Sequence, residues 1–119
     1  MRNIIIFSNN KSMCSQITSY LREAGYSHIY LVSDCLEGFS MIYRLNPKLI
    51  IIDMELPADE ILRLKKMISG PLASITLFIA PHTYTDVGIL SMIKRGYSHF
   101  IIHPIDKPLF LQAVQEIIN

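Results

Sequence analysis

Continuous runs of apolar residues alternate with amphipathic stretches along the whole chain. The apolar runs are Asn3–Phe7, His28–Val32, Leu49–Asp53, Ile75–Ala80 and Phe100–Ile102. Strands that are buried on both faces, as in parallel sheets, have this continuous apolar pattern. We therefore expect these five segments to be the strands of one parallel sheet.

Each apolar run is followed by a stretch with apolar residues at helical spacing. The expected helices cover Met13–Ala24, Cys35–Leu45, Pro57–Ile68, Tyr84–Arg95 and Asp106–Ile118. Asp34 and Asp106 are suitable N-caps, and Gly25 and Gly96 are suitable stops. From the second, third and fifth of these helices, the residues expected to face the core are Leu36, Phe39, Ile42, Tyr43, Ile61, Leu62, Leu64, Ile68, Leu109, Val114, Ile117 and Ile118.

Strands that alternate with helices predict an α/β fold, a parallel sheet with helices on both faces and right-handed crossovers. The 119 residues, half of them hydrophobic, suit one doubly wound domain covering residues 1–119. The apolar runs are shorter than the roughly 18 residues of a membrane span. Asn3–Ser8 already belongs to the expected fold, so we expect neither a signal peptide nor a membrane contact.

Charge and cysteine content narrow the class of protein further. Eleven basic and ten acidic residues give a net charge of +1 without any charged block. The sequence therefore shows no basic segment that would indicate binding to nucleic acid or to an anionic membrane. Cys14 and Cys35 are expected on different helices as unpaired residues, which indicates a reducing, cytoplasmic location.

The strongest candidate for a site is Asp53, which ends an apolar strand four residues before Pro57. Open α/β sheets keep their sites at the carboxyl ends of the strands. The loops expected at that edge also carry Ser8–Asn10, Ala80–His82 and His103. The histidines show no metal-ligand spacing, so no metal site is expected from them.

Three landmarks in this order resemble the bacterial response-regulator receiver domain, the phosphoacceptor module of two-component signalling. They are Arg22–Tyr26 at the end of the first helix, Leu49–Pro57 around Asp53, and Gly96–Pro104 around the fifth strand. The likeness covers essentially the whole chain and implies a (βα)5 flavodoxin-like, CheY-like fold with strand order 2-1-3-4-5.

The resemblance also implies a surface for partners. In receivers, the helix matching Tyr84–Arg95, the strand matching Phe100–Ile102 and the helix matching Asp106–Ile118 form the signalling or dimerisation face. On these helices, the side chains that belong either to the core or to that face are Tyr84, Val87, Leu90, Met92 and Phe110.

By the same resemblance, Asp53 stands at the phosphoacceptor position and the backbone carbonyl of Glu55 at a metal-ligand position. The two acids that receivers use to hold Mg²⁺ are replaced by Ser8 and Asn9, with Asn10 after them. One pair of unit charges ~4 Å apart interacts by about 4 kcal/mol at an effective dielectric of ~20, and a divalent ion doubles this. Weak Mg²⁺ binding through Asn9, Asp53 and the Glu55 carbonyl is therefore the most that we expect.

The positions that contact the phosphoryl group in receivers also differ. The family hydroxyl at the end of the fourth strand is matched by Ile79, followed by Ala80, and the family lysine by His103. Phe100 matches the switch aromatic but lacks the phenolic hydroxyl. Without metal and lysine, charge that develops during phosphoryl transfer has little to stabilise it.

A buried Asp53 carboxylate still needs partners, because an unpaired buried charge is costly. The candidates are Ser8, Asn9, backbone N–H groups at the start of the third helix, and a protonated His103. An Asp53–His103 contact would make the pocket sensitive to pH near neutrality. The alternative is that His103 is a plain structural residue.

These observations favour a pseudo-receiver that regulates through protein contact, with no catalytic residues and no cofactor. The expected partners are an output domain, a histidine kinase or a second copy of the chain. One alternative is a working receiver that is phosphorylated on Asp53 despite a weak Mg²⁺ site. A more distant alternative is a small flavodoxin-like ligand-binding protein, although no Gly-rich phosphate loop follows any strand.

Overall fold

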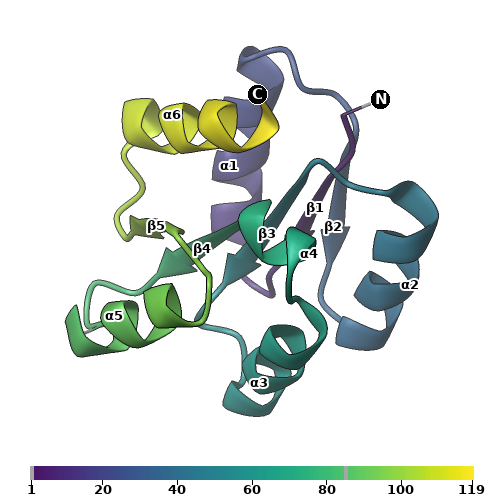
Figure 1. Ribbon diagram of the computed structural model, residues 1–119. Coiled ribbons are helices and arrows are strands. Elements are labelled where there is room, and N and C mark those ends of the chain that lie inside the picture. Colours follow the sequence, from purple (N-terminus) through teal and green to yellow (C-terminus); the bar gives the residue numbers. More distant parts are fainter. Residues whose placement is uncertain (1, 85) are drawn as a thin grey trace.

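Five parallel strands form a sheet at the centre of the computed structural model, which describes residues 2–84 and 86–119 (Figure 1). The strands are β1 (Ile4–Phe7), β2 (Ile29–Val32), β3 (Leu49–Asp53), β4 (Thr76–Ala80) and β5 (His99–Ile102). Their order is β2-β1-β3-β4-β5, and every neighbouring pair is parallel. The predicted fold class and strand order are therefore confirmed.

The helices form two layers over the sheet (Figure 1). They are α1 (Lys11–Glu23), α2 (Cys35–Leu45), α3 (Ala58–Met67), α4 (Pro71–Ser74), α5 (Asp86–Lys94) and α6 (Lys107–Ile118). The helices α1 and α6 cover one face, and α2, α3 and α5 cover the other. Within the described residues, no helix has the length and apolar character needed to cross a membrane.

Alternate residues of the central strands pack into opposite halves of the core. On β1, Ile4 and Ile6 face the layer of α1 and α6, while Ile5 and Phe7 face the other layer. Successive side chains of a strand point to opposite faces of its sheet, and both faces here are covered by helices. This burial explains the continuous apolar runs of β1, β3 and β4. The edge strands β2 and β5 are only partly buried, contrary to expectation, and expose Leu31 and Ile102.

Several expected boundaries shift by one or two residues. The first helix begins at Lys11, because the Asn10 side chain caps the Met13 N–H at 3.0 Å. The helix expected over Tyr84–Arg95 is observed as Asp86–Lys94; Thr85 lies outside the described residues. The strand expected over Phe100–Ile102 begins at His99. The N-caps Asp34 and Asp106 are confirmed.

The short helix α4 was not predicted. The sequence Ser69-Gly70-Pro71 was expected only to break the third helix. Gly70 adopts a positive φ of 58°, which glycine allows, and Pro71 then begins a single helical turn. Proline is favourable in a first turn because its missing N–H would have no intrahelical partner there.

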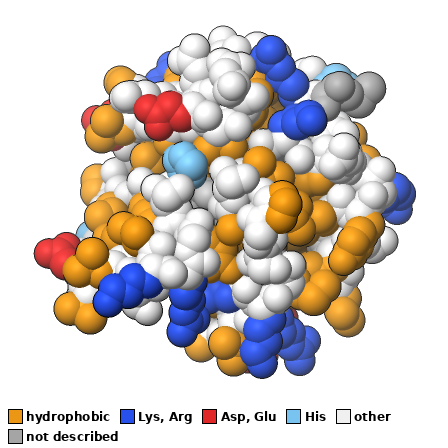
Figure 2. Space-filling view, in the orientation of Figure 1, with side chains coloured by type: hydrophobic (Ala, Val, Ile, Leu, Met, Phe, Trp, Pro, Cys, Tyr) orange, Lys and Arg blue, Asp and Glu red, His pale blue; other side chains and the backbone are white. Residues whose placement is uncertain are grey.

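Four residues expected in the core are instead exposed: Leu36, Tyr43, Leu62 and Leu109. On α2 the exposed fractions of Leu36 and Tyr43 reach 70% and 80%, and the helix buries Cys35, Gly38 and Met41 instead. Of the expected stripe, Ile42 is buried and Phe39 is half-buried against the core, whereas Leu36 and Tyr43 lie outside the face that packs on the sheet. Hydrophobic side chains consequently remain visible on the molecular surface (Figure 2).

The orientation of α2 follows from a close approach between Gly38 and the buried ring of Phe7. A Cβ atom built on Gly38 would lie 2.0 Å from Cε1 of Phe7. The Phe7 ring is held in the core on β1 and is only 1% exposed. Only a residue without a side chain allows the helix this close to the sheet.

The Gly38→Ala variant should lower the free energy of unfolding by about 1–3 kcal/mol, because overpacking a filled core costs this much. Alanine is otherwise the better helix former by about 1 kcal/mol. Ser40→Ala, at an exposed position of the same helix, is the matched control and should leave stability nearly unchanged. Urea denaturation of both variants tests this; equal stability of Gly38→Ala and the native chain would contradict the packing described here.

Candidate functional site

Asp53 is buried at the carboxyl end of the central strand β3, where 2% of its surface is exposed. Its Oδ2 accepts a hydrogen bond from Ser8 Oγ at 2.8 Å, and its Oδ1 accepts one from the Glu55 backbone N–H at 2.9 Å. Both carboxylate oxygens thus have a donor from the protein. Of the partners expected from sequence, Ser8 is confirmed. The backbone donor is Glu55 in the loop before α3, and not an N–H group at the start of that helix as expected.

Ser8 connects Asp53 to the beginning of α1. Its hydroxyl is buried, and besides donating to Asp53 it accepts a hydrogen bond from the Asn10 N–H at 3.0 Å. Asn10 in turn caps α1. A continuous chain of hydrogen bonds therefore runs from the helix cap through Ser8 to the carboxylate, which fixes the loop between β1 and α1.

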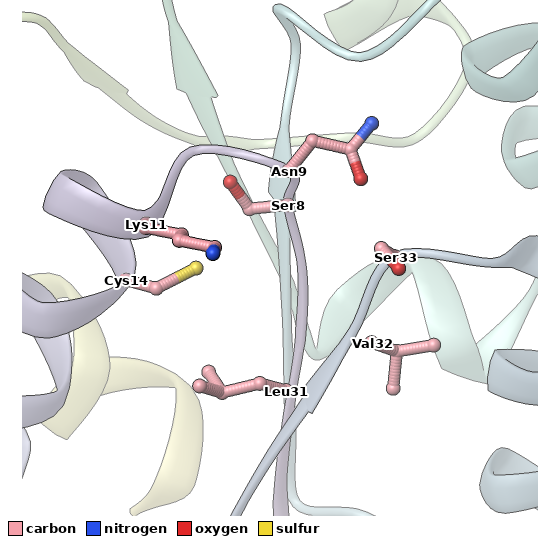
Figure 3. A pocket seen from close by; sticks show the side chains of 7 residues that line it. All are labelled: Ser8, Asn9, Lys11, Cys14, Leu31, Val32 and Ser33. Atoms are coloured by element: carbon pink, nitrogen blue, oxygen red, sulfur yellow. The ribbon is translucent and has the colours of Figure 1, made fainter.

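Asn9 and Asn10 take no part in holding the carboxylate through their side chains. Both are exposed, and the Asn10 amide is engaged at the helix cap. Figure 3 shows the Asn9 side chain and the Ser8 hydroxyl extending in different directions from the strand end. The side chain of Asn9, expected as a partner of Asp53, makes no hydrogen bond to it among the described residues.

His103 does not pair with Asp53, contrary to one of the two sequence-based expectations. Its Nε2 lies 3.2 Å from Sδ of Met13 on α1, and both oxygens of Asp53 have other donors. The sequence placed His103 at the carboxyl edge of the sheet, after β5, but it did not predict the direction in which the side chain points. The contact with Met13 supports the structural alternative for this histidine.

The remaining positions from the resemblance are apolar and packed. Ile79 and Ala80 at the end of β4 are completely buried, and Ile79 stands opposite Asp53 in the strand register. Phe100 is half-buried and stacks on Phe78 with ring centroids 5.9 Å apart. No hydroxyl is therefore presented to Asp53 from the end of β4.

The groups around Asp53 fit Mg²⁺ poorly. Mg²⁺ prefers hard oxygen ligands, with one or two carboxylates in octahedral geometry. Asp53 supplies one carboxylate, whose two oxygens already accept hydrogen bonds. Across the described part of the chain, no three acidic, histidine or cysteine side chains gather closely enough to hold a metal ion.

A cavity of about 360 Å³ lies beside Ser8, between α1 and the edge strand β2 (Figure 3). Its lining comes from three separate segments of the chain: Ser8, Asn9, Lys11, Cys14, Leu31, Val32 and Ser33. The Lys11 amine and the Cys14 sulfur point into it (Figure 3). The cavity could not be predicted from the sequence, because its lining residues form no local motif. Asp53 is not among the lining residues.

The Cys35 thiol is not activated as a nucleophile. Cys14 and Cys35 are buried, unbonded and on different helices. Burial, and next a hydrogen bond to Glu60, raises the pKa of Cys35 from 9.0 to about 12. The Cys35 thiol is therefore neutral at physiological pH, and a neutral thiol is a poor nucleophile.

The helices α5 and α6 divide their apolar residues between the core and the surface. Met92 and Phe110 are buried, whereas Val87 and Leu90 are exposed and Tyr84 is half-buried. Further exposed apolar side chains lie on the edge strand β5 and on α6. We call the exposed apolar residues of these three elements the α5–β5–α6 face: Val87, Leu90, Ile93, Ile102 and Leu109.

No protein-family model matches the chain, and no curated protein matches it. Solved structures do match over its whole length. A signal receiver domain of a response regulator from Bacteroides fragilis has 20% sequence identity and a TM-score of 0.85, covering 100% of this chain and 98% of that one. The chain has the receiver-domain fold.

Two further solved structures match this chain with similar sequence identity and coverage. A putative response regulator from Chloroflexus aurantiacus has 19% identity and a TM-score of 0.81, covering 98% of this chain and 97% of its own. The receiver domain of a sensor histidine kinase from Pseudomonas aeruginosa has 18% identity and a TM-score of 0.73, with coverage of 98% and 97%. That structure contains a magnesium ion coordinated in its active-site cleft.

Ser8→Ala should lower the free energy of unfolding by about 1–3 kcal/mol, because it removes a donor from a buried carboxylate. The loss should be smaller in an Asp53→Ala background, where the partner of that donor is already absent. Ser33→Ala, an exposed serine lining the same cavity, serves as the control. A double-mutant cycle by chemical denaturation measures the coupling; equal losses in both backgrounds would contradict the Ser8–Asp53 hydrogen bond.

Proposed function

We propose that this chain is a receiver-type signalling module that acts through protein contacts and has no enzymatic activity. The observation that carries the proposal is the environment of Asp53, whose oxygens are held by Ser8 and the Glu55 N–H inside a receiver fold. In this account Asp53 is a structural or switch residue held without metal.

The surroundings of Asp53 also argue against efficient phosphoryl transfer. Such transfer depends on cations and donors that stabilise the charge developing on the phosphoryl oxygens. Ile79 offers no hydroxyl next to Asp53, and His103 is turned to the Met13 sulfur. The receiver fold is retained here while the groups that would perform the chemistry are replaced.

The apolar face on α5, β5 and α6 is the proposed contact surface for the signal. Its residues Val87, Leu90 and Ile102 are large apolar side chains that are exposed, and exposed apolar surface of this kind marks protein interfaces. We propose that an output domain, a histidine kinase or a second copy of the chain binds there. The receiver-fold matches include NtrX from Brucella abortus, of which this chain covers only 26%.

The two buried, unbonded cysteines favour a reducing, cytoplasmic location for the module.

A phosphoacceptor receiver is the second candidate function. One observation favours it: Asp53 is retained at the carboxyl end of β3, the edge of the sheet where open α/β folds have their functional sites. The two candidates differ in whether Asp53 accepts a phosphoryl group, which can be measured directly.

Incubation of the native chain with Mg²⁺ and acetyl phosphate should yield no phosphorylated Asp53 by intact-mass spectrometry, because the charge on the transferring group has no stabilising partners. A variant with restored groups, Ser8→Asp/Asn9→Asp/Ile79→Thr/His103→Lys, is the positive control and should gain phosphorylation. Stoichiometric modification of the native chain that is lost in Asp53→Ala would establish the phosphoacceptor function instead.

A further inference from the structure

A groove of about 400 Å³ lies between α3 and α5, on a different surface from the apolar α5–β5–α6 face. It begins at the loop after Asp53 and ends at the carboxyl-terminal ends of both helices. Its lining residues are Met54, Leu56, Ala58, Ile61, Leu62, Lys65, Tyr84 and Arg95. The walls are therefore mainly apolar, and two cations lie at one end.

The walls of the groove are held by internal contacts. The Tyr84 hydroxyl donates to Sδ of Met92 at 3.5 Å, and its ring lies against Gly88, where a Cβ atom would be 3.0 Å away. Ile61 is buried in the core below the groove, whereas Leu62 is exposed at its edge. The groove thus offers apolar side chains on a preformed surface.

Positive charge gathers at the end of the groove. Lys65 from the last turn of α3 and Arg95 directly after α5 both line the groove. Figure 2 shows Lys and Arg side chains along this lower edge of the molecule. Neither Lys65 nor Arg95 forms an ion pair within the described residues, where the salt bridge joins Lys107 to Glu23.

The charge exceeds what the helix ends themselves require. Each helix carboxyl terminus carries roughly half a negative elementary charge, so the two together balance about one of the two cations, Lys65 and Arg95. Burial, and next the neighbouring Arg95 charge, lowers the pKa of Lys65. Lys65 and Arg95 are therefore like charges that influence each other at one end of the groove.

We propose that the α3–α5 groove binds an acidic amphipathic helix of a partner protein. Apolar side chains at helical spacing would fill the space along Leu56, Ile61 and Leu62, as in other helix-in-groove complexes. Carboxylates at one end of that helix would meet Lys65 and Arg95, and this charge complementarity fixes its direction. Stacking of nucleic-acid bases is disfavoured, because the one aromatic ring of the lining, Tyr84, is packed on α5.

This surface depends neither on phosphorylation nor on the α5–β5–α6 face, so it goes beyond the proposed function. It is nevertheless connected to the Asp53 site. Met54 and Leu56 line the groove and flank Glu55, whose N–H donates to Asp53. A bound helix would therefore touch the loop that holds the carboxylate.

The test is a selection of random peptides of about 16 residues, roughly four helical turns, against the full chain. Selected peptides should be rich in Asp and Glu and carry apolar residues at helical spacing. By fluorescence anisotropy, their affinity should fall about ten-fold or more in Lys65→Glu/Arg95→Glu and should weaken with added salt. Arg44→Glu/Lys48→Glu, which reverses two exposed charges elsewhere, is the matched control and should bind normally.

Leu62→Lys, at an exposed wall position, should lose the same peptides, and circular dichroism of each variant checks that it is folded. The proposal is overturned by selected peptides that are not acidic, by equal binding to the reversed variant and the control, or by the absence of any binder. It is also overturned if oligothymidylate or phosphatidylserine vesicles bind more tightly than the peptides and depend on the same two residues.

Discussion

A carboxylate buried at the end of the central strand constrains the whole carboxyl rim of this sheet. Removal of an ion from water is tolerated only where hydrogen bonds or an opposite charge compensate for it. For Asp53 the compensation comes from the Ser8 hydroxyl and the Glu55 N–H. Because Ser8 also accepts from the backbone at the cap of α1, the loops after β1 and β3 are fixed together.

This arrangement separates the fold from the chemistry usually associated with it. The strand order and the surrounding helices of the receiver fold are all present, and Asp53 stands at the end of the central strand. The neighbours of Asp53 are instead Ser8, which donates a hydrogen bond to it, and Ile79, which has no hydroxyl. His103 contacts the Met13 sulfur and not the carboxylate. The α5–β5–α6 face and the α3–α5 groove both adjoin α5, and the two surfaces are the basis of our proposal that the chain acts through contact with other proteins.

The strands and the parallel α/β fold could be predicted from the sequence, because strands that are covered by helices on both faces are uninterrupted apolar runs. The facing side of α2 was predicted only in part: Ile42 is buried as expected, but Leu36 and Tyr43 are exposed. A long-range contact between Gly38 and Phe7, which sets this side, is not visible in the sequence. The direction of His103 depends on Met13, which is distant in the chain. The basic groove was missed because two separate segments supply its cations, while the net charge of the chain is nearly balanced.

The central claim is that hydrogen bonds, and not a metal ion, hold Asp53, and the Mg²⁺ dependence of unfolding tests it most directly. Binding to the folded state raises stability with ligand concentration, so a metal site would show itself in the denaturation midpoint. We predict no change for the native chain, whereas Ser8→Asp/Asn9→Asp should be destabilised by repulsion between its carboxylates and should recover with Mg²⁺. Stabilisation of the native chain by Mg²⁺ that disappears in Asp53→Ala would contradict the account.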